Sequence, residues 1–354
     1  MSRLPLLVAL LALAGTTALS QTPSPPPALQ STPAPPAGSY SERIDVELST
    51  LVVRVEDRKT GGSLTGLGAA DFRLFVGRTE LPVEAVEWVG AGPPLDAEEA
   101  AELEAAGLAP PPAGKLVVLF VQADFHPSRM SGQLRMLPEA KRFLDTLGYE
   151  DRVAVVSFDS HLKLRLDFTD DRERVRRALD EAILTGPEPW LRKGAGPSLA
   201  RTFDFAAAQR AAKPEKGLEL TARALEPLPG RKVLVYLGWG LGRFGALGVT
   251  LPPEYSAAVA SLRRSGTSVF VLDVTDADYH SLEAGLREIA DDTGGTYSKT
   301  HQNPKAAAGR VAGLIGGHYV LYFRPPGSEV KGALRVELAG SRRGEVLMAP
   351  AELP

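Results

Sequence analysis

Three side chains that could take part in chemistry follow one long apolar run of the sequence. The stretch FVQADFHPSR, over residues 120–129, places Asp124, His126 and Ser128 close together in the chain. A carboxylate, an imidazole and a hydroxyl can contribute to a metal site or to a hydrolase, but either chemistry needs further groups. The rest of the sequence must supply those partners before these residues can be given a chemical role.

A second polar group follows another apolar run, in the stretch VLDVTDADYH over residues 271–280. Asp273, Asp276, Asp278 and His280 could gather a cation there, but their spacing lacks the EF-hand pattern and its terminal glutamate. We expect these side chains to form turns and to cap a helix.

Other signatures of catalysis are weak or missing from the sequence. Residues 240–245 fit G-x-G-x-x-G, but VTLPPEY follows them and a helix does not open directly, so we interpret them as a flexible glycine loop. The chain has no cysteine, no G-x-S-x-G and no H-E-x-x-H, and its histidines have no metal-ligand spacing.

Alternating strands and helices must position these residues between 115 and 316. The runs KLVVLFVQA, RVAVVSF, RKVLVYLG and TSVFVLDV are almost continuously apolar, which is typical of strands buried on both faces. Amphipathic helices lie between them, and one is predicted over residues 131–148 with Asp124 as its cap. This order predicts an α/β domain with a Rossmann-like, doubly wound, mostly parallel sheet.

Shorter β segments flank this domain on both sides. Residues 41–90 alternate with period two and predict a small β-module, and residues 317–354 predict further short strands. The C-terminal strands either pair with the N-terminal ones or extend the central sheet, and the sequence does not distinguish these arrangements. Residues 91–114 form an acidic, proline-bracketed connector, in which residues 96–106 could be helical.

The N-terminus predicts export. Arg3, a short apolar core and small residues before Gln21 are typical of a cleavable signal peptide over residues 1–20, cut after Ser20. A retained, uncleaved anchor is the alternative. Residues 21–40 are rich in proline and predict an extended linker. We expect a secreted or periplasmic protein with no membrane span in its mature chain.

The overall composition gives no sign of nucleic-acid binding. The 354 residues carry 40 basic and 43 acidic side chains, without a basic stripe. A hydrophobic fraction of 44% with 23% charged residues is ordinary for a chain that buries a core. Because cysteine is absent, an exported form must be held together by that core and not by disulfides.

Several longer phrases carry a family resemblance. They are LVVRVEDRKTGGSLTGLGAADFRLFVGRTELPVEAVEWV, DRVAVVSF, FTDDRERVRRALDEAI, GRKVLVYLG and HYVLYFRP. From about Ile44 onward the chain resembles von Willebrand factor type A-like proteins of the acidobacterial type. The resemblance implies a Rossmann-like sheet with a possible metal site at its carboxyl edge.

In that family the metal site reads Asp-x-Ser-x-Ser after the first strand, with a later threonine and an aspartate after the fourth strand. The resemblance implies a hard cation held by oxygen ligands, with one position left for a partner's carboxylate.

This sequence departs from the family's metal motif. Gln122 stands at the first aspartate, and Asp124 and His126 fall at the two serines. A motif that starts at Asp124 restores only the hydroxyl of Ser128, and Trp239 replaces the aspartate after RKVLVYLG. Glutamine is a weak ligand for magnesium and histidine suits softer metals, so we expect a degenerate site without a metal or other cofactor.

We therefore predict an exported, non-enzymatic module that binds an unidentified protein partner at the edge of its sheet. The expected binding residues are Gln122, Asp124, His126, Trp239 and Phe244. Trp239 and Phe244 would serve as aromatic anchors.

Two alternatives stay open. The first is a metal-dependent adhesion module with an atypical site for a cation such as Mg²⁺, rebuilt from Asp124, Ser128, Asp273 and Asp276. The second is a hydrolase that uses His126 with Asp124, although no recognised turn positions a nucleophile.

Overall fold

The computed structural model describes residues 48–90, 114–184, 186, 187, 191, 196–246, 248–326, 332–340 and 344–353. The predicted signal peptide, the linker over 21–40 and nearly all of the acidic connector lie outside these residues. The described residues all belong to one compact unit, Val46–Pro354. Among the described helices, none combines the length and the apolar character that crossing a membrane requires.

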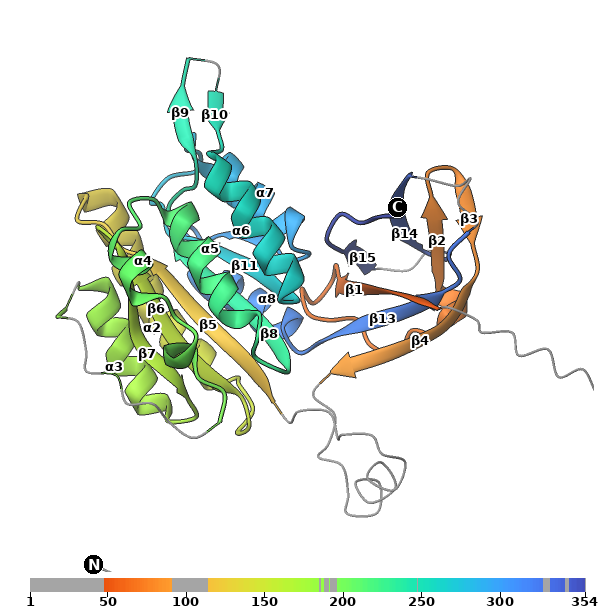
Figure 1. Cartoon of the computed structure of the whole chain (residues 1–354), viewed down its shortest axis with the longest axis horizontal. Helices are drawn as coiled ribbons and strands as arrows, with labels where there is room; N and C mark the ends of the chain where they lie inside the picture. The colour runs from red at the N-terminus through yellow and green to blue at the C-terminus, as the bar shows by residue number, and fades with distance from the viewer. Residues whose placement is uncertain are drawn as a thin grey trace, which may run out of the picture. The chain divides into compact units, whose positions relative to one another are not determined.

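Six strands of the described chain form a central sheet in the order β12-β11-β8-β5-β6-β7 (Figure 1). Neighbouring strands are parallel, except that β7 runs antiparallel to β6. The strands are β5 (Lys115–Gln122), β6 (Arg152–Phe158), β7 (Leu162–Thr169), β8 (Arg231–Gly238), β11 (Thr267–Asp273) and β12 (Tyr297–Lys299). The mostly parallel sheet predicted from the apolar runs is confirmed.

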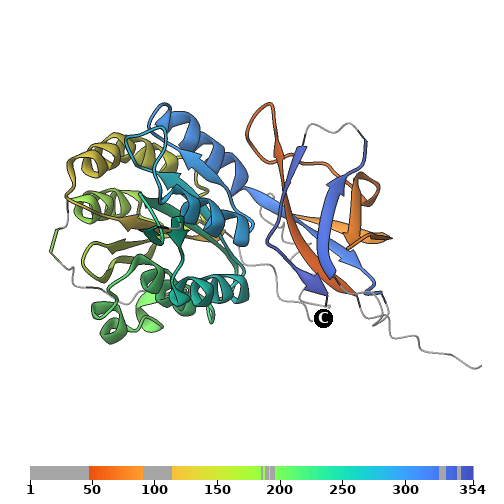
Figure 2. The same cartoon turned by 90° about the horizontal axis from the view of Figure 1, so that it is seen from above.

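Helices cover both faces of this sheet (Figure 2). They are α2 (Pro127–Leu144), α3 (Arg172–Ile183), α4 (Phe205–Gln209), α5 (Pro214–Leu225), α6 (Pro253–Arg264), α7 (Glu283–Asp292) and α8 (Pro304–Leu314), with 3-10 turns at Ala69–Asp71 and Leu199–Arg201. Successive β5 side chains enter opposite cores, because strand residues alternate in direction. Val117 packs with α2, α3 and α8, whereas Val118 packs with α5, α6 and α7. Each fully buried side chain of this kind stabilises the fold by roughly 1.5–3 kcal/mol.

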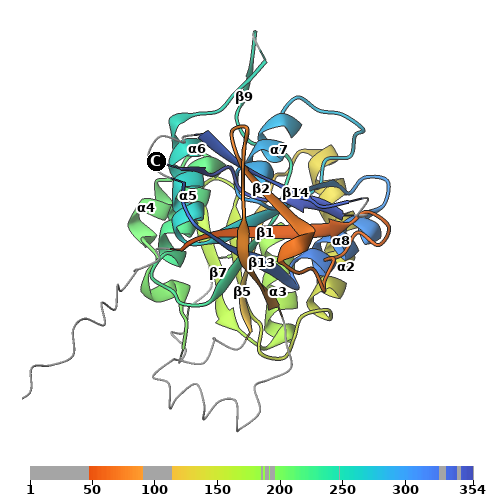
Figure 3. The same cartoon turned by 90° about the vertical axis from the view of Figure 1, so that its right-hand side faces the viewer.

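The N-terminal and C-terminal strands together form a two-sheet β-sandwich. Its sheets have the orders β15-β1-β13-β4 and β16-β14-β2-β3, and in Figure 3 strands from the two ends of the chain lie interleaved. The strands are β1 (Ser49–Asp57), β2 (Phe72–Val76), β3 (Thr79–Leu81), β4 (Val83–Gly90), β13 (Gly317–Phe323), β14 (Gly332–Leu338), β15 (Gly344–Leu347) and β16 (Glu352–Leu353). This settles the question that the sequence left open, because β13 pairs with both β1 and β4.

Polar contacts from β1 join the sandwich to the α/β part. The guanidinium of Arg54 is buried and donates to Ser268 Oγ at 2.7 Å and to the carbonyl oxygen of Gly294 at 3.2 Å. Burial, together with the charge of Arg231, lowers the pKa of Arg54 to about 10. Glu56, two residues further along, accepts two hydrogen bonds from Arg310 at 2.6 and 2.5 Å.

The first helix after β5 begins earlier than the sequence predicted. Helix α2 starts at Pro127 with His126 as its N-cap residue, so Asp124 does not cap a helix near Ser131. Proline fits the first helical position because its fixed φ suits the helix and its missing N–H would be unpaired there anyway. The segment HPSR is therefore a helix start, not an extended loop.

Glu56→Gln should lower the free energy of unfolding by about 1–3 kcal/mol, because a bidentate bond to a charged group is lost at a buried position. Urea denaturation would measure the change. Glu345→Gln is the control, since Glu345 is exposed and lies 3.9 Å from Arg58, and it should change stability by less than about 0.5 kcal/mol. Equal effects of the two variants would contradict the role given to Glu56.

His318, on β13, should make stability depend on pH. Burial and the charges of Arg54 and Arg231 lower the pKa of His318 from its ordinary value of 6.5 to about 4. Between these values the unfolded chain binds the proton more strongly than the folded chain does, so His318 makes stability fall as the pH drops from about 6.5 to about 4. In His318→Gln this fall should be smaller, as followed by urea denaturation at several pH values. The exposed His126→Gln serves as the control variant. If the free energy of unfolding depends on pH in His318→Gln as it does in the wild type, the role given to His318 is refuted.

Candidate functional site

Gln122 is the last residue of β5, and its side-chain amide oxygen is fully engaged within the protein. Gln122 Oε1 accepts hydrogen bonds from Tyr236 Oη at 3.0 Å, from the backbone N–H of Trp239 at 3.0 Å and from that of Gly240 at 3.2 Å. The side chain is only 2% exposed. The arrangement links β5 to β8 and to the turn that follows β8, so Gln122, predicted as a binding residue, is a buried structural acceptor that exposes almost no surface.

Glycine is required beside this amide. A Cβ atom at Gly238 would lie 2.2 Å from Tyr236 Cε1 and 2.7 Å from Gln122 Oε1, closer than non-bonded atoms approach. The close approach of Gly238 thus allows the amide oxygen to reach the backbone N–H groups of Trp239 and Gly240.

Asp124 is held by its own loop and by the first turn of α2. One carboxylate oxygen accepts from the backbone N–H of His126 at 2.8 Å, and the other forms an ion pair with Arg129. Burial alone would raise the pKa of Asp124, but these two partners bring it below its ordinary value. The imidazole of His126 contacts Ser128 Oγ through Nδ1 at 2.9 Å. The Asp124 carboxylate therefore bonds the His126 backbone and not its ring, so no Asp–His relay forms at this loop.

Trp239 is half-buried and packs against its own fold. Its ring contacts the core beneath α2, and the Arg129 guanidinium carbon lies 3.4 Å from the ring centroid. The ring of Trp239, which the sequence predicted as an aromatic anchor, is thus covered by the Arg129 guanidinium through a cation–π contact.

The side chains of Gln122, Asp124 and Trp239 do not fit the oxygen-ligand set of the hard cation in the resembled family. Gln122 Oε1 already accepts three hydrogen bonds, Asp124 is paired with Arg129, and Trp239 offers no oxygen ligand from its side chain. Magnesium needs several oxygen ligands, usually with carboxylates among them. The position therefore lacks the donor set that such an ion requires.

Three exposed aromatic side chains instead lie in the connections after three adjacent strands. Phe125 follows β5 and is 65% exposed, Phe244 follows β8 and is 68% exposed, and Tyr279 follows β11 and is 76% exposed. Carboxyl ends of parallel strands meet at one edge of a sheet, where open α/β sheets bind ligands. The sequence prediction named only Phe244. An aromatic residue three to six positions after a buried strand is the signal that could have found Phe125 and Tyr279.

Phe244 is carried by a short β-hairpin. Strands β9 (Arg243–Gly245) and β10 (Gly248–Thr250) pair in antiparallel fashion, with Phe244 opposite Val249. Figures 1 and 3 both show this hairpin extending beyond the helices. The glycine-rich segment 240–245 therefore leads into a hairpin and not into a helix. This agrees with the exclusion of a nucleotide-binding turn. Paired strands, however, form where the sequence predicted a flexible loop.

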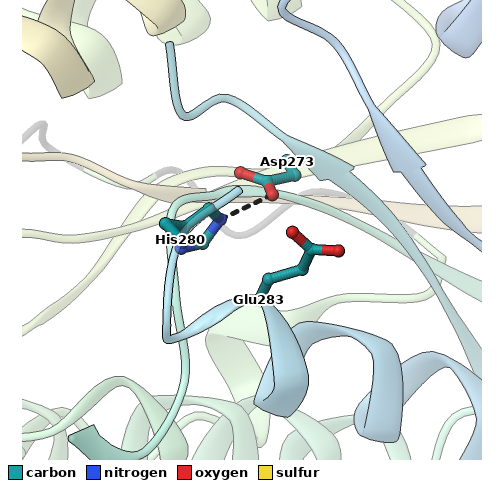
Figure 4. Close-up of side chains that lie close together, drawn as sticks. All are labelled: Asp273, His280 and Glu283. Atoms are coloured by element: carbon teal, nitrogen blue, oxygen red, sulfur yellow. Dashed lines mark hydrogen bonds and ion pairs between the residues drawn. The ribbon is translucent and has the colours of Figure 1, made fainter. Parts of the chain in front are cut away.

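The polar residues after β11 separate into two groups. Asp276 forms an ion pair with Arg135 at 2.6 Å, and Asp278 accepts from Gln302 at 2.8 Å. Asp273 is buried and accepts from His280 Nε2 at 2.7 Å, and Figure 4 shows Glu283 beside them. Glu283 was missed in the sequence because it opens helix α7 and belongs to no established motif with Asp273.

Comparisons with known proteins concern the fold. No protein-family model matches the sequence. No curated protein matches it either. Among solved structures, a von Willebrand factor type A protein from Catenulispora acidiphila is 11% identical, with 88% of this chain and 74% of that chain covered and a TM-score of 0.40.

Two further solved structures each cover a little over half of this chain. An aerotolerance-related membrane protein from Bacteroides fragilis is 18% identical over 56% of this chain and 98% of its own, with a TM-score of 0.38. The vWF domain of the type V pili tip protein Mfa5 from Porphyromonas gingivalis is 10% identical over 56% of this chain and 94% of its own, with a TM-score of 0.39. Two of these three structures carry the von Willebrand factor name, which is the family that the sequence resembles. At such identities and TM-scores the likeness says nothing about function.

Gln122→Leu should lower the free energy of unfolding by about 1–3 kcal/mol, because it leaves three donors at a buried or partly buried position without their acceptor. The control is Gln302→Leu, which alters an exposed glutamine and should change stability by less than about 0.5 kcal/mol. Urea denaturation followed by circular dichroism would measure both variants. Equal stability of Gln122→Leu and the wild type would show that the network is dispensable.

Proposed function

We propose that this chain is an exported, non-enzymatic module that binds a protein partner at the carboxyl edge of its α/β sheet. The observation that carries the proposal is the set of exposed aromatic side chains at this edge, Phe125, Phe244 and Tyr279. Aromatic residues provide most of the binding energy in many protein interfaces, and large exposed apolar groups gathered on one surface mark interaction sites.

The polar groups at the same edge support binding more than catalysis. The Asp124 carboxylate is paired with Arg129, and the side-chain oxygen of Gln122 already accepts hydrogen bonds from within the protein. A hydrolase would need a nucleophile, a base and an orienting acid in mutual contact, whereas His126 contacts Ser128 without support from the Asp124 carboxylate. Recognition would therefore rest on apolar contact, and the degenerate metal position would not bridge to a partner's carboxylate.

Export is the second part of the proposal. It rests on the sequence of residues 1–20, which has the charge, apolar core and small residues of a cleavable signal peptide. The partner would then be a periplasmic or extracellular protein. N-terminal sequencing of the secreted form should begin at Gln21.

Replacing Phe244 by Ser should weaken partner capture by about thirtyfold, which corresponds to about 2 kcal/mol for an aromatic residue at the centre of an interface. Phe125→Ser and Tyr279→Ser should have the same direction of effect. Crosslinking of the full chain in its native cells, followed by mass spectrometry, would identify the partner, and surface plasmon resonance would then compare the variants. Capture should not require added Mg²⁺.

Tyr149→Ser is the matched control. Tyr149 is 76% exposed, as Tyr279 is, but it precedes β6 and so belongs to the amino edge of the sheet. Its replacement should leave capture unchanged. Binding that is weakened equally by Tyr149→Ser and Phe244→Ser, or by neither, would refute the proposed surface.

A further inference from the structure

Asp273, His280 and Glu283 bring three potential metal ligands together at the end of β11. One ligand atom from each residue lies within 4.8 Å of the others, and Figure 4 shows the three side chains turned toward a common point. The ligands of a zinc ion at about 2.0–2.1 Å are about 3.3 Å apart in tetrahedral geometry. Small side-chain rotations would separate His280 Nε2 from Asp273 Oδ2, now 2.7 Å apart, and bring the three ligand atoms to that spacing. This group is separate from the position after β5 that the resembled family uses.

Neighbouring residues hold these ligands in place. Asp273 accepts from Tyr297 Oη at 2.6 Å and from the backbone N–H of Thr275 at 3.0 Å, and Arg287 donates to Glu283 Oε1 at 2.8 Å. Metal ligands are usually oriented by such outer hydrogen bonds, which fix the side chains before the ion arrives. Both carboxylates are nearly buried, at 3% and 6% exposure for Asp273 and Glu283.

A cationic side chain already lies against the second carboxylate oxygen of Glu283. Lys299 Nζ is 2.9 Å from Glu283 Oε2, while the Lys299 side chain is 34% exposed. Two buried carboxylates require compensating positive charge, and the Arg287 guanidinium supplies part of it. Lys299, whose Nζ also donates to the Asp278 carbonyl oxygen, is a partly exposed lysine on a flexible stem and can turn to solvent when another cation replaces it. The position therefore favours a cation, and the ammonium is the exchangeable one.

We propose that Asp273, His280 and Glu283 form a binding site for a divalent transition-metal ion of the zinc class, which displaces the Lys299 ammonium. Two carboxylates and one imidazole suit Zn²⁺, whereas Mg²⁺ prefers oxygen ligands alone. A bound ion would join the end of β11 to the start of α7 and so fix the intervening segment, which carries Tyr279. The site does not depend on the aromatic binding surface being functional.

Titration calorimetry of the untagged, metal-stripped full chain with Zn²⁺, Mn²⁺ and Mg²⁺ tests this site. We expect a single Zn²⁺ to bind and Mg²⁺ to bind more weakly. His280→Gln and Glu283→Gln should each weaken Zn²⁺ binding by at least about tenfold. His301→Gln and Asp276→Asn should not, because these nearby residues have other partners.

Lys299→Gln provides a test that leaves every ligand intact. It removes the competing ammonium, so Zn²⁺ should bind more tightly than to the wild type. Circular dichroism would establish that each variant is folded. The proposal is overturned if the wild type binds no Zn²⁺, if His280→Gln and Glu283→Gln bind it as the wild type does, or if Lys299→Gln does not tighten binding.

Discussion

A neutral oxygen at the centre of the carboxyl edge determines how this edge is built. Gln122 Oε1 satisfies one hydroxyl and two backbone donors while it is almost completely buried. An ionised carboxylate in the same place would carry a desolvation cost of several kcal/mol unless a cation accompanied it. With an amide there, the end of β5 needs no accompanying cation, and Arg129 can pair with Asp124 and cover Trp239. The loops that leave this neutral edge present aromatic side chains to solvent.

Much of the α/β part could be predicted from the sequence, because burial on both faces leaves a direct mark on composition. The run from Lys115 to Gln122 is buried at every position and reads as continuous apolar sequence except at its ends. The sandwich could not be predicted in the same way. Its strands pair residues as distant as Ser49 and Phe323, and alternation shows that one face is buried without showing which strand covers it.

The candidate sites show a similar limit. Asp124, His126 and Ser128 are close in sequence and remain close in space, but their chemistry is decided by Arg129 and Trp239, whose contact depends on how α2 packs beside the turn after β8. Likewise, Asp273 and His280 could be noticed in one stretch, whereas Glu283 and Tyr297 join them only through the placement of α7 and β12. Which side chains come together in a candidate site is therefore determined by tertiary packing and not by residue type.

The position of β13 between β1 and β4 has a consequence for biogenesis. The α/β part is an insertion within the sandwich, since it lies in the chain between strands that must pair with each other. During synthesis, β1 and β4 emerge long before β13 and have open edges until it arrives. Completion of the sandwich is thus a late event, and a chaperone that shields early strand edges would protect this chain from aggregation.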